Sequence, residues 1–377
     1  MRISFLSVFP PYRGGISEHS SLIYKHLIKN NKVQALNFKK LYPSLFFPGK
    51  TQYNVSSKES IGSRVIDSVN FISWIKTVDY ICKYKPDLLI FKFWHPFFAP
   101  CYNFIIKRVK AKYAINVIMI CDNIYPHEKF PFARKIIKKL ADNVDAFIVQ
   151  SSIVEKELHS LINAPVYEKV NHPIYDSYPL ALDKDSAKKR IDIVGEKIVL
   201  FFGIIRSYKG LDILIKSMEK VFENDSQIRL LIVGECYSNK NLYMKLINSS
   251  NHKDRIVWVD KFVEDSDVSA YFSAADVVVL PYRTASQSGV IPLAYHYNKP
   301  VITSDLESLV EVVKDGKTGL IYNSDKEEDL CLKILDFFKN HKSGLYEKNI
   351  IEYKQSFSWD DFEKSIIRIT DILNERS

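Results

Sequence analysis

The stretch that decides the fold is IVLFFGIIRSYKGLDILIKSM, residues 198–218. The apolar run Ile198–Phe202 predicts a buried strand, and a short loop and a helix-like apolar spacing follow it. The loop places Gly203, Arg206 and Lys209 at the carboxyl end of that strand, where open α/β sheets bind ligands. Two cations beside a glycine suit phosphate oxygens, and a solvated basic loop is the alternative interpretation.

The same alternation of short apolar runs and amphipathic stretches continues on both sides of this segment. It predicts parallel sheets joined by crossover helices. In the second half we expect strands at Ile198–Phe202, Arg229–Val233, Ile256–Val259, Asp276–Leu280, Pro300–Thr303 and Gly319–Tyr322. In the first half we expect strands at Arg2–Val8, Val33–Phe38, Asp87–Phe91, Ala114–Ile120, Ala146–Val149 and Val166–Val170, with a helix over Arg64–Tyr84.

The pattern predicts an α/β protein with two Rossmann-like domains. We expect the first domain over residues 1–172 and a proline-containing linker over 173–190. The second domain is expected over 191–356, followed by a helix over 357–377 for which a return to the first domain is one interpretation. Two such domains predict a cleft between them, with ligands at the carboxyl ends of the strands.

Composition excludes several classes of protein. Of the 377 residues, 46% are hydrophobic and 26% are charged, which is typical of a globular chain. The 5 cysteines are scattered without a CxxC pair, which disfavours a disulfide framework or a structural zinc site and favours a reducing cytoplasm. No apolar run reaches about 18 residues, so we expect no transmembrane helix. The apolar N-terminal segment is too short for a secretory signal.

The charge is divided unevenly along the chain. Residues 1–175 hold 25 basic and 12 acidic residues, whereas residues 176–377 hold 28 basic and 32 acidic residues. Basic stretches at 107–112 and 130–140 contain interleaved apolar residues, which suits a peripheral contact with anionic lipid. A helix with its apolar stripe in the core and its lysines in water explains them equally. No DNA or RNA motif accompanies the charge, so we expect no nucleic-acid partner.

Two further loops have the composition of anion sites. Gly14 and Gly15 follow the first strand and precede a helix, although the full GxGxxG dinucleotide pattern is absent. In the loop after Asp276–Leu280, we expect Ser288 to cap a helix and the amides of Gln287–Val290 to form an anion nest. A plain strand-to-helix turn and a simple capped helix are the respective alternatives.

Taken together, several segments resemble the retaining nucleotide-sugar glycosyltransferases of the GT-B fold, family four. The segments are FFGIIRSYKGLDILIKSM, LLIVGE, ADVVVLPYR, SGVIPLAYHYNKPVITSDLESLVEVVKDGKTGLIY and FSWDDF. The likeness is strong over residues 197–360 and fainter, but in register, over 1–175. It implies the GT-B fold, retention of the anomeric configuration, no metal and no cofactor, with the nucleotide-sugar as co-substrate.

The resemblance is carried over residue by residue. Lys209 and Gly210 match the family's GR-L-x-x-x-KG element, but Ile204 occupies the usual arginine position and Arg206 lies two residues later. Ala285 and Leu293 stand where the family's E-x7-E element has the glutamates that contact the donor sugar and ribose. How the ribose is held is therefore left open.

The site residues that follow from the motifs and the resemblance fall into three groups. The catalytic candidates are His95, Arg206 and Lys209. The donor-binding candidates are Gly14, Gly15, Gly203, Phe262, Val263, Ser286, Gln287, Ser288, Gly289 and Val290, with Phe262 and Val263 placed to offer backbone groups to the base. Residues assigned mainly structural roles are His19, Asp122, His127, Glu128, Glu307 and Glu311. For His95, packing between aromatic residues is the alternative.

The leading hypothesis is a glycosyltransferase that moves a sugar from a UDP- or GDP-sugar to a glycan or lipid-linked acceptor. Bacterial surface polysaccharide synthesis, in the cytoplasm or peripherally at the inner face of the membrane, is the expected setting. Two alternatives stay open: a sugar-nucleotide epimerase of the same architecture, and an inert homologue that binds a nucleotide-sugar. We expect the basic first half to meet the acceptor and the second half to hold the donor.

Overall fold

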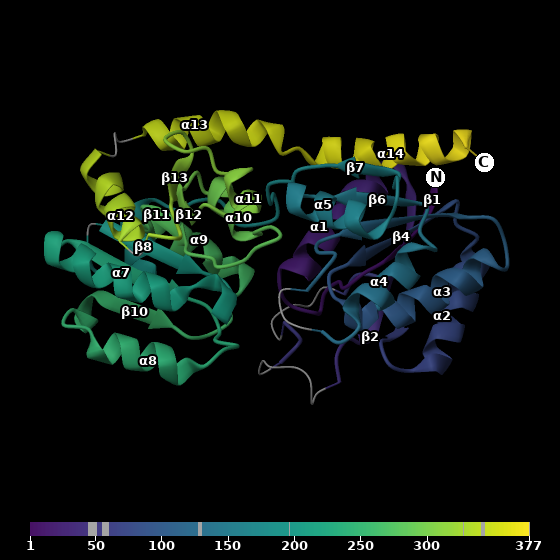
Figure 1. Ribbon diagram of the computed structural model, residues 1–377, viewed down its shortest axis with the longest axis horizontal. Coiled ribbons are helices and arrows are strands. Elements are labelled where there is room, and N and C mark those ends of the chain that lie inside the picture. Colours follow the sequence, from purple (N-terminus) through teal and green to yellow (C-terminus); the bar gives the residue numbers. More distant parts are fainter. Residues whose placement is uncertain are drawn as a thin grey trace. The chain divides into compact units, whose positions relative to one another are not determined.

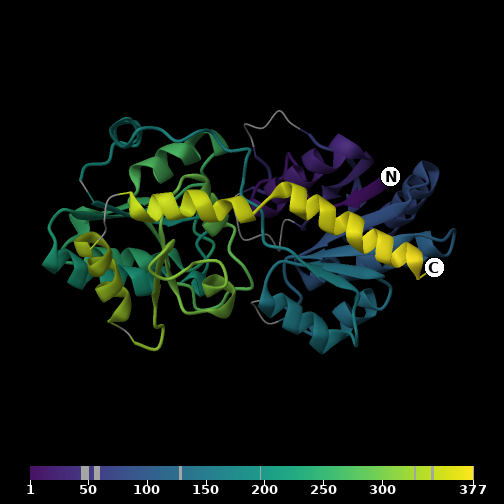
Figure 2. The ribbon, with the colours of Figure 1, turned by 90° about the horizontal axis from the view of Figure 1, so that it is seen from above.

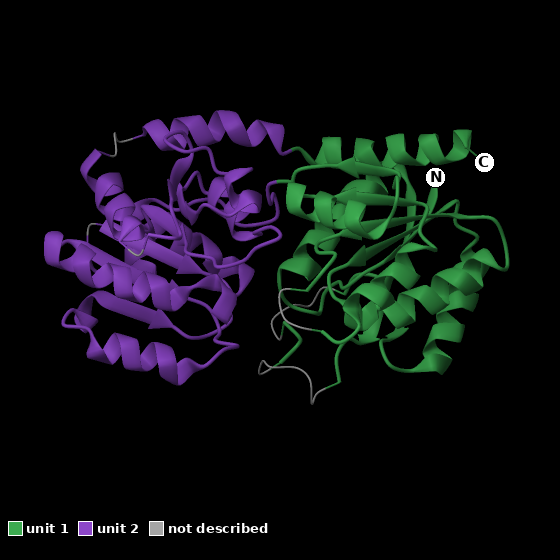
Figure 3. Cartoon of the chain, in the orientation of Figure 1, with its two compact units in different colours: residues 1–173, 358–377 green, residues 174–357 purple. Residues whose placement is uncertain are grey.

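A computed structural model describes residues 1–43, 51–54, 60–126, 130–195, 197–326, 328–340 and 344–376. The chain divides into two compact units, shown in Figure 3. Unit 1 comprises residues 1–173 and 358–377, and unit 2 comprises residues 174–357. Each unit has its own parallel sheet with helices against it (Figure 1).

Unit 1 contains a parallel sheet with the strand order β3-β2-β1-β4-β5-β6-β7. Its strands are β1 (Arg2–Leu6), β2 (Lys32–Lys40), β3 (Ser63–Asp67), β4 (Leu88–Phe93), β5 (Asn116–Cys121), β6 (Ala146–Val149) and β7 (Tyr167–Lys169). The central strand β4 is buried along its whole length, as a strand covered by helices on both faces must be. Parallel pairing brings the carboxyl ends of β1, β4 and β5 to one edge of the sheet.

The helices of unit 1 cover both faces of this sheet. They are α1 (Gly15–Asn30), α2 (Phe71–Tyr84), α3 (Ala99–Lys110), α4 (Ala133–Ala141), α5 (Ser152–Leu161) and α14 (Trp359–Glu375). Apolar side chains of α2, α3, α4 and α5 share one core with alternate residues of the strands. On the other face α14 contacts α1, β6 and β7, and it runs across the strands in Figure 2.

The helix expected over Arg64–Tyr84 is wrong in its first part. Residues Ser63–Asp67 form the edge strand β3 beside β2, with Ile66 fully buried. Helix α2 begins only at Phe71, because the side chain of Asn70 accepts the N–H groups of Ile72 and Ser73 and so caps the helix there. The β-branched pair in 65–66 favours the strand, and the capping asparagine separates it from the helix.

Unit 2 contains a parallel sheet with the order β10-β9-β8-β11-β12-β13. The strands are β8 (Lys197–Phe202), β9 (Ile228–Val233), β10 (Ile256–Val259), β11 (Val277–Leu280), β12 (Val301–Ser304) and β13 (Gly319–Tyr322). All six predicted strands of this half are confirmed to within one residue. The helices are α6 (Lys184–Arg190), α7 (Leu211–Asn224), α8 (Lys240–Ser249), α9 (Asp265–Ala274), α10 (Val290–His296), α11 (Glu307–Val310), α12 (Asp329–Asn340) and α13 (Leu345–Tyr353).

Two features of the structure bear on the sequence predictions about the whole chain. The segment expected to be the linker, residues 173–190, contains helix α6. The carboxylate of Asp183 accepts the N–H of Ser186 and so caps the start of this helix. In the described ranges of the chain, no helix is long and apolar enough to cross a membrane.

Candidate functional site

The loop after β8 lies at the carboxyl edge of the unit 2 sheet and is held against the end of β9. The N–H of Gly203 donates to the carbonyl of Val233 at 2.9 Å, and the N–H of Ile205 donates to the carbonyl of Glu235 at 3.0 Å. Gly203 has φ +102°, a conformation that other residues rarely adopt. The loop is therefore fixed by backbone bonds rather than being a free basic turn.

Lys209 brings a positive charge into this loop. It ends the 3₁₀ turn Ser207–Lys209, and its Nζ lies 3.0 Å from the point where a Cβ on Gly203 would stand. The side chain of Val290, at the start of α10, lies 3.6 Å from the same point. The fold thus brings together three predicted donor-site residues from two loops that follow the adjacent strands β8 and β11.

The surroundings of Lys209 disfavour its charged form. Desolvation by burial, and then the nearby charge of Arg206, lower its pKa to about 8. Among the residues that the structure describes, no carboxylate forms an ion pair with it, and its Nζ lies 5.6 Å from the centroid of the Tyr282 ring. A perturbed cation beside a glycine loop is a typical feature of a binding site.

Arg206 immediately precedes the 3₁₀ turn and adds a second positive charge to the loop. Its guanidinium carbon lies 5.7 Å from the centroid of the Tyr237 ring, which follows β9. The effect of its charge on Lys209 places the two cations close to each other, as their spacing in the sequence predicts.

Sequence reasoning missed the clamp that holds this loop. Arg283, after β11, donates through both terminal nitrogens to the carboxylate of Asp212, at 2.8 and 2.6 Å. It also donates to the carbonyl of Ser207 at 2.9 Å, and its own N–H donates to the carbonyl of Tyr208 at 2.7 Å. The signal available in the sequence was an arginine shortly after strand β11 and an aspartate in the first turn of α7, the helix that follows the neighbouring strand β8.

We predict that Arg283→Ala weakens nucleotide binding by about ten- to a hundredfold, because a misplaced Lys209 loses its geometry toward the phosphates. Titration calorimetry with UDP and with GDP measures this change in affinity. Arg283→Lys is expected to keep only part of the nucleotide affinity, because a lysine cannot make the bidentate bond to Asp212. The matched control is Arg190→Ala, which removes an exposed arginine pair with Asp267 in the same unit and should leave affinity unchanged.

A second readout separates positioning from general damage. In a Lys209→Ala background the Arg283→Ala change should cost no further affinity, because the group that it positions is gone. Additive losses in the double variant would contradict the assigned role.

The loop before α10 carries the predicted small polar residues. Ser286 is buried, Gln287 and Ser288 are half-buried, and Gly289 is exposed. Helix α10 begins at Val290 with Gly289 in the cap position, one residue later than expected, yet the hydroxyl of Ser288 accepts the Val290 N–H at 3.3 Å as a capping serine would.

Gly289 lies close to a neighbouring tyrosine side chain. A Cβ on this residue would lie 2.9 Å from the hydroxyl oxygen of Tyr175. The positions expected from the E-x7-E comparison, Ala285 and Leu293, are both buried.

Phe262 and Val263 follow β10, the edge strand of the sheet, two strands away from β8. Val263 is buried and Phe262 is half-buried. Their predicted contact with a base stays a prediction. Glu307 opens α11 in its first turn, and Glu311 follows the last residue of that helix.

In unit 1, Gly14 is the cap residue of α1. Its φ of +104° suits glycine, and a Cβ there would meet nothing within 4 Å. Packing therefore does not explain this glycine, whereas the backbone conformation at the helix start does. Gly15 is the first residue of α1, so both predicted glycines lie at one helix N-terminus.

His95 caps a short turn, a role that the sequence analysis did not anticipate. It precedes the 3₁₀ turn Pro96–Phe98, and its Nδ1 accepts the N–H of Phe97 at 3.2 Å. Its ring packs edge-on against Phe130 with centroids 5.3 Å apart, so the aromatic environment expected in the alternative interpretation is present.

Several residues assigned structural roles form one buried polar cluster at the carboxyl edge of the unit 1 sheet. The ammonium of Lys92, fully buried in β4, lies 3.1 Å from the Asp122 carboxylate and contacts Nδ1 of His19. The ring of His172 stacks on His19 at 4.2 Å. Burial, and then the charge of Lys92, hold the pKa of His19 well below its usual value. His127 and Glu128 lie outside the described residues.

The chain is similar to known glycosyltransferases in part of its sequence and in its fold. Residues 196–340 match the model of the family described as glycosyl transferases group 1, a segment that contains the Lys209 loop and α10. Over the whole chain, sucrose-phosphate synthase from Thermosynechococcus elongatus has a TM-score of 0.75 at 18% identity and 100% coverage of both chains. Anabaena Alr3699/HepE in complex with UDP-glucose has a TM-score of 0.72 at 16% identity, covering 100% of this chain and 99% of that chain. The two-domain GT-B fold is thereby confirmed.

Among curated relatives, a GDP-mannose:glycolipid 4-beta-D-mannosyltransferase of Xanthomonas campestris pv. campestris is 24% identical over 57% of this chain and 58% of its own length. The chain spans between 52% and 60% of the length of the first three curated relatives that it matches.

Proposed function

We propose that the protein is a retaining glycosyltransferase that transfers a sugar from a UDP- or GDP-sugar to a saccharide acceptor. The observation that carries the proposal is Lys209, a half-buried cation without a carboxylate partner in the described structure, set against Gly203 at the carboxyl edge of the unit 2 sheet. A diphosphate is the complementary ligand, and the matched family model covers the same segment.

The donor phosphates are proposed to lie against Lys209 and Arg206, with the amides around Ser286–Val290 on their other side. Negative charge grows on the nucleoside diphosphate as it departs, so groups already in place stabilise the transition state more than the ground state. In this proposal the two side chains and the amides supply the positive charge, and neither a metal nor a cofactor takes part. Gly14 and Gly15, at the start of α1, are proposed as further donor-binding residues.

The proposed reaction replaces one bond to the anomeric carbon by another. The bond between the anomeric carbon and the phosphate oxygen breaks, and the electron pair leaves with the diphosphate. An acceptor hydroxyl forms the new bond on the same face of the sugar, and its proton passes to the departing phosphate oxygen. Configuration is thereby retained. His95 is proposed to contact the donor sugar or the acceptor.

The acceptor is proposed to be a glycan or a lipid-linked saccharide of a bacterial surface polysaccharide. The similar Xanthomonas protein is named for a glycolipid acceptor, which is consistent with this class. The basic unit 1 would then meet an acidic acceptor or an anionic membrane surface from the cytoplasmic side.

A nucleotide screen tests the proposal. Thermal-shift and calorimetric titrations with UDP, GDP and their sugars are expected to show stabilisation by one nucleotide family, followed by transfer or slow hydrolysis of the corresponding sugar with retained configuration. A nucleotide-sugar that is bound and interconverted without transfer would favour an epimerase. Binding without any turnover would favour an inert homologue, and no response to any nucleotide would contradict the proposal.

A further inference from the structure

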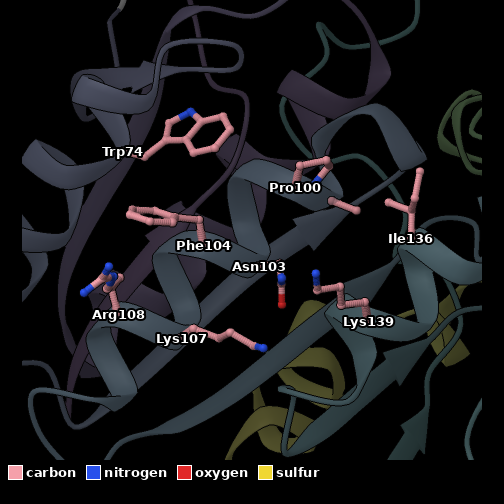
Figure 4. Close-up of a pocket in the computed structure, with 9 residues that line it drawn as sticks. Trp74, Pro100, Asn103, Phe104, Lys107, Arg108, Ile136 and Lys139 are labelled. Atoms are coloured by element: carbon pink, nitrogen blue, oxygen red, sulfur yellow. The ribbon is translucent and has the colours of Figure 1, made fainter.

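A hollow on the surface of unit 1, remote in sequence from the donor loops, combines positive charge with aromatic walls. Helices α2, α3 and α4 lie side by side on one face of the sheet (Figure 1), and a cavity of about 490 Å³ opens among them. The side chains that line it include Trp74, Phe104, Lys107, Arg108 and Lys139, which Figure 4 shows around the hollow.

Three cations line this hollow: Lys107, Arg108 and Lys139. In the described parts of the chain, Lys107 and Lys139 form no ion pair, and the guanidinium of Arg108 lies 5.5 Å from the centroid of the Phe104 ring. Their sequence neighbours behave differently, since Lys110 binds Asp145 at 2.7 Å and Lys112 binds Asp79 at 2.7 Å.

Apolar side chains extend from the rim of the hollow into solvent. Phe71 packs on Phe104 with ring centroids 4.6 Å apart and is still 52% exposed. Ile72 and Ile75, on the same first turns of α2, are 64% and 44% exposed. On α4 the cap residue Phe132 is 74% exposed, one turn before Ile136 on the pocket wall. Exposed aliphatic and aromatic residues beside unpaired cations are typical of membrane-surface contacts.

Both interpretations of the amphipathic stretch 130–140 stay open in the structure. Ile137 and Leu140 are buried in the sheet core, as the structural alternative requires. Lys138 pairs with Asp142, whereas Lys139 faces the hollow. The charge of the whole unit has the same sign: residues 1–173 and 358–377 together carry a net charge of +11.

We infer that the α2–α3–α4 hollow is a seat for the anionic headgroup of a membrane phospholipid. In this arrangement the lipid phosphate lies among Lys107, Arg108 and Lys139, and Ile72, Ile75 and Phe132 enter the interfacial layer beside it. Charge complementarity selects an anionic headgroup, and the aliphatic rim selects a membrane rather than a nucleic acid, whose contacts with protein are polar and stacked. The inference rests on the proposed function only for the role of headgroup binding, which is to keep the enzyme near a lipid-linked acceptor.

Co-sedimentation of the full chain with vesicles tests it. Wild-type protein should bind vesicles of phosphatidylglycerol and phosphatidylcholine in about a 3:7 ratio, and bind pure phosphatidylcholine weakly. Each basic residue near an anionic surface contributes about fivefold in partitioning, so the Lys107→Gln, Arg108→Gln, Lys139→Gln variant should lose about a hundredfold. The matched control changes Lys25, Lys29 and Lys32 to Gln, on α1 and the start of β2, and should lose far less.

A second variant addresses the apolar rim. Ile72→Ser with Ile75→Ser replaces two exposed side chains without altering the charge, and about a tenfold loss of vesicle binding is expected. Circular dichroism confirms that each variant is folded. Equal losses of vesicle binding in the triple Gln variant of the hollow and in the Lys25, Lys29, Lys32 control would indicate diffuse charge and overturn the inference. Negligible binding of the wild-type protein to both kinds of vesicle would also overturn it, as would binding of a single-stranded oligonucleotide in place of vesicles. Vesicle binding requires no sugar transfer, so a failed nucleotide screen would contradict the proposed function and leave this result standing.

Discussion

Replacing Lys209 by Ala should lower sugar transfer by about a hundred- to a thousandfold and weaken nucleotide binding by about ten- to a hundredfold. The Nζ of Lys209 lies beside Gly203, in a loop held by backbone bonds, so no neighbouring cation can move into its place without rebuilding that loop. Calorimetry with the preferred nucleotide and single-turnover transfer measure the two effects. Lys216→Ala, an exposed lysine on α7, is the matched control and should behave as wild type.

The stability of the unliganded protein distinguishes a binding role from a structural one. Burial makes the charged form of Lys209 unfavourable in the absence of a ligand, so Lys209→Met should not lower the unfolding temperature. A loss of nucleotide binding together with a large loss of stability would indicate that Lys209 supports the fold instead.

The pH dependence of binding gives an independent check on the same residue. With a pKa of about 8, Lys209 is mostly charged at neutral pH and mostly neutral above about pH 9. A bound diphosphate favours the charged form, so the dissociation constant should rise by up to about tenfold per pH unit above pH 8. Lys209→Arg stays charged over this range and should give a flat profile wherever it still binds. A flat wild-type profile would contradict the assigned role.

Replacing Asp122 by Ala should destabilise unit 1 by about 3–5 kcal/mol, because it leaves the buried ammonium of Lys92 without a counter-charge. Urea unfolding followed by tryptophan fluorescence suits the measurement, since Trp74, Trp94 and Trp359 all belong to unit 1. Removing the lysine as well, in an Asp122→Ala, Lys92→Met variant, should recover most of the loss.

The matched control for this prediction is an ion pair at the surface of the same unit. Asp79 and Lys112 are joined at 2.7 Å, but their side chains are 63% and 49% exposed. Asp79→Ala should therefore cost less than about 1 kcal/mol. Losses of similar size in Asp79→Ala and Asp122→Ala would show that the buried pair is no more important than a surface one.

Much of the fold could be read from local patterns. Continuous apolar runs such as Ile198–Phe202 and Gly319–Tyr322 have the length and composition of buried parallel strands, and each became one. The expected start of α2 is wrong because apolar residues recur through the strand β3 and the helix after it with no glycine or proline between them. The capping bonds of Asn70 to the N–H groups of Ile72 and Ser73 mark the boundary.

The candidate site divides in the same way. Gly203, Lys209 and the loop before α10 could be selected from sequence because glycines, cations and a strand end occur together within a few residues. The Arg283–Asp212 clamp and the Lys92–Asp122 pair could not, because their members lie 71 and 30 positions apart. Only the strand order brings those positions to one edge of a sheet.

The sequence by itself determined the two α/β halves, the phosphate-like loops and the excess of positive charge in the first half, because these depend on composition and on short-range periodicity. The tertiary structure decided which charges are neutralised. Lys110 and Lys112 form surface ion pairs, and Lys92 forms a buried ion pair with Asp122. Only the structure shows that Lys209 and the cations of the α2–α3–α4 hollow have no carboxylate partner among the described residues. The physical reason is that an ion pair depends on distance and burial, which arise only when strands and helices distant in sequence pack together.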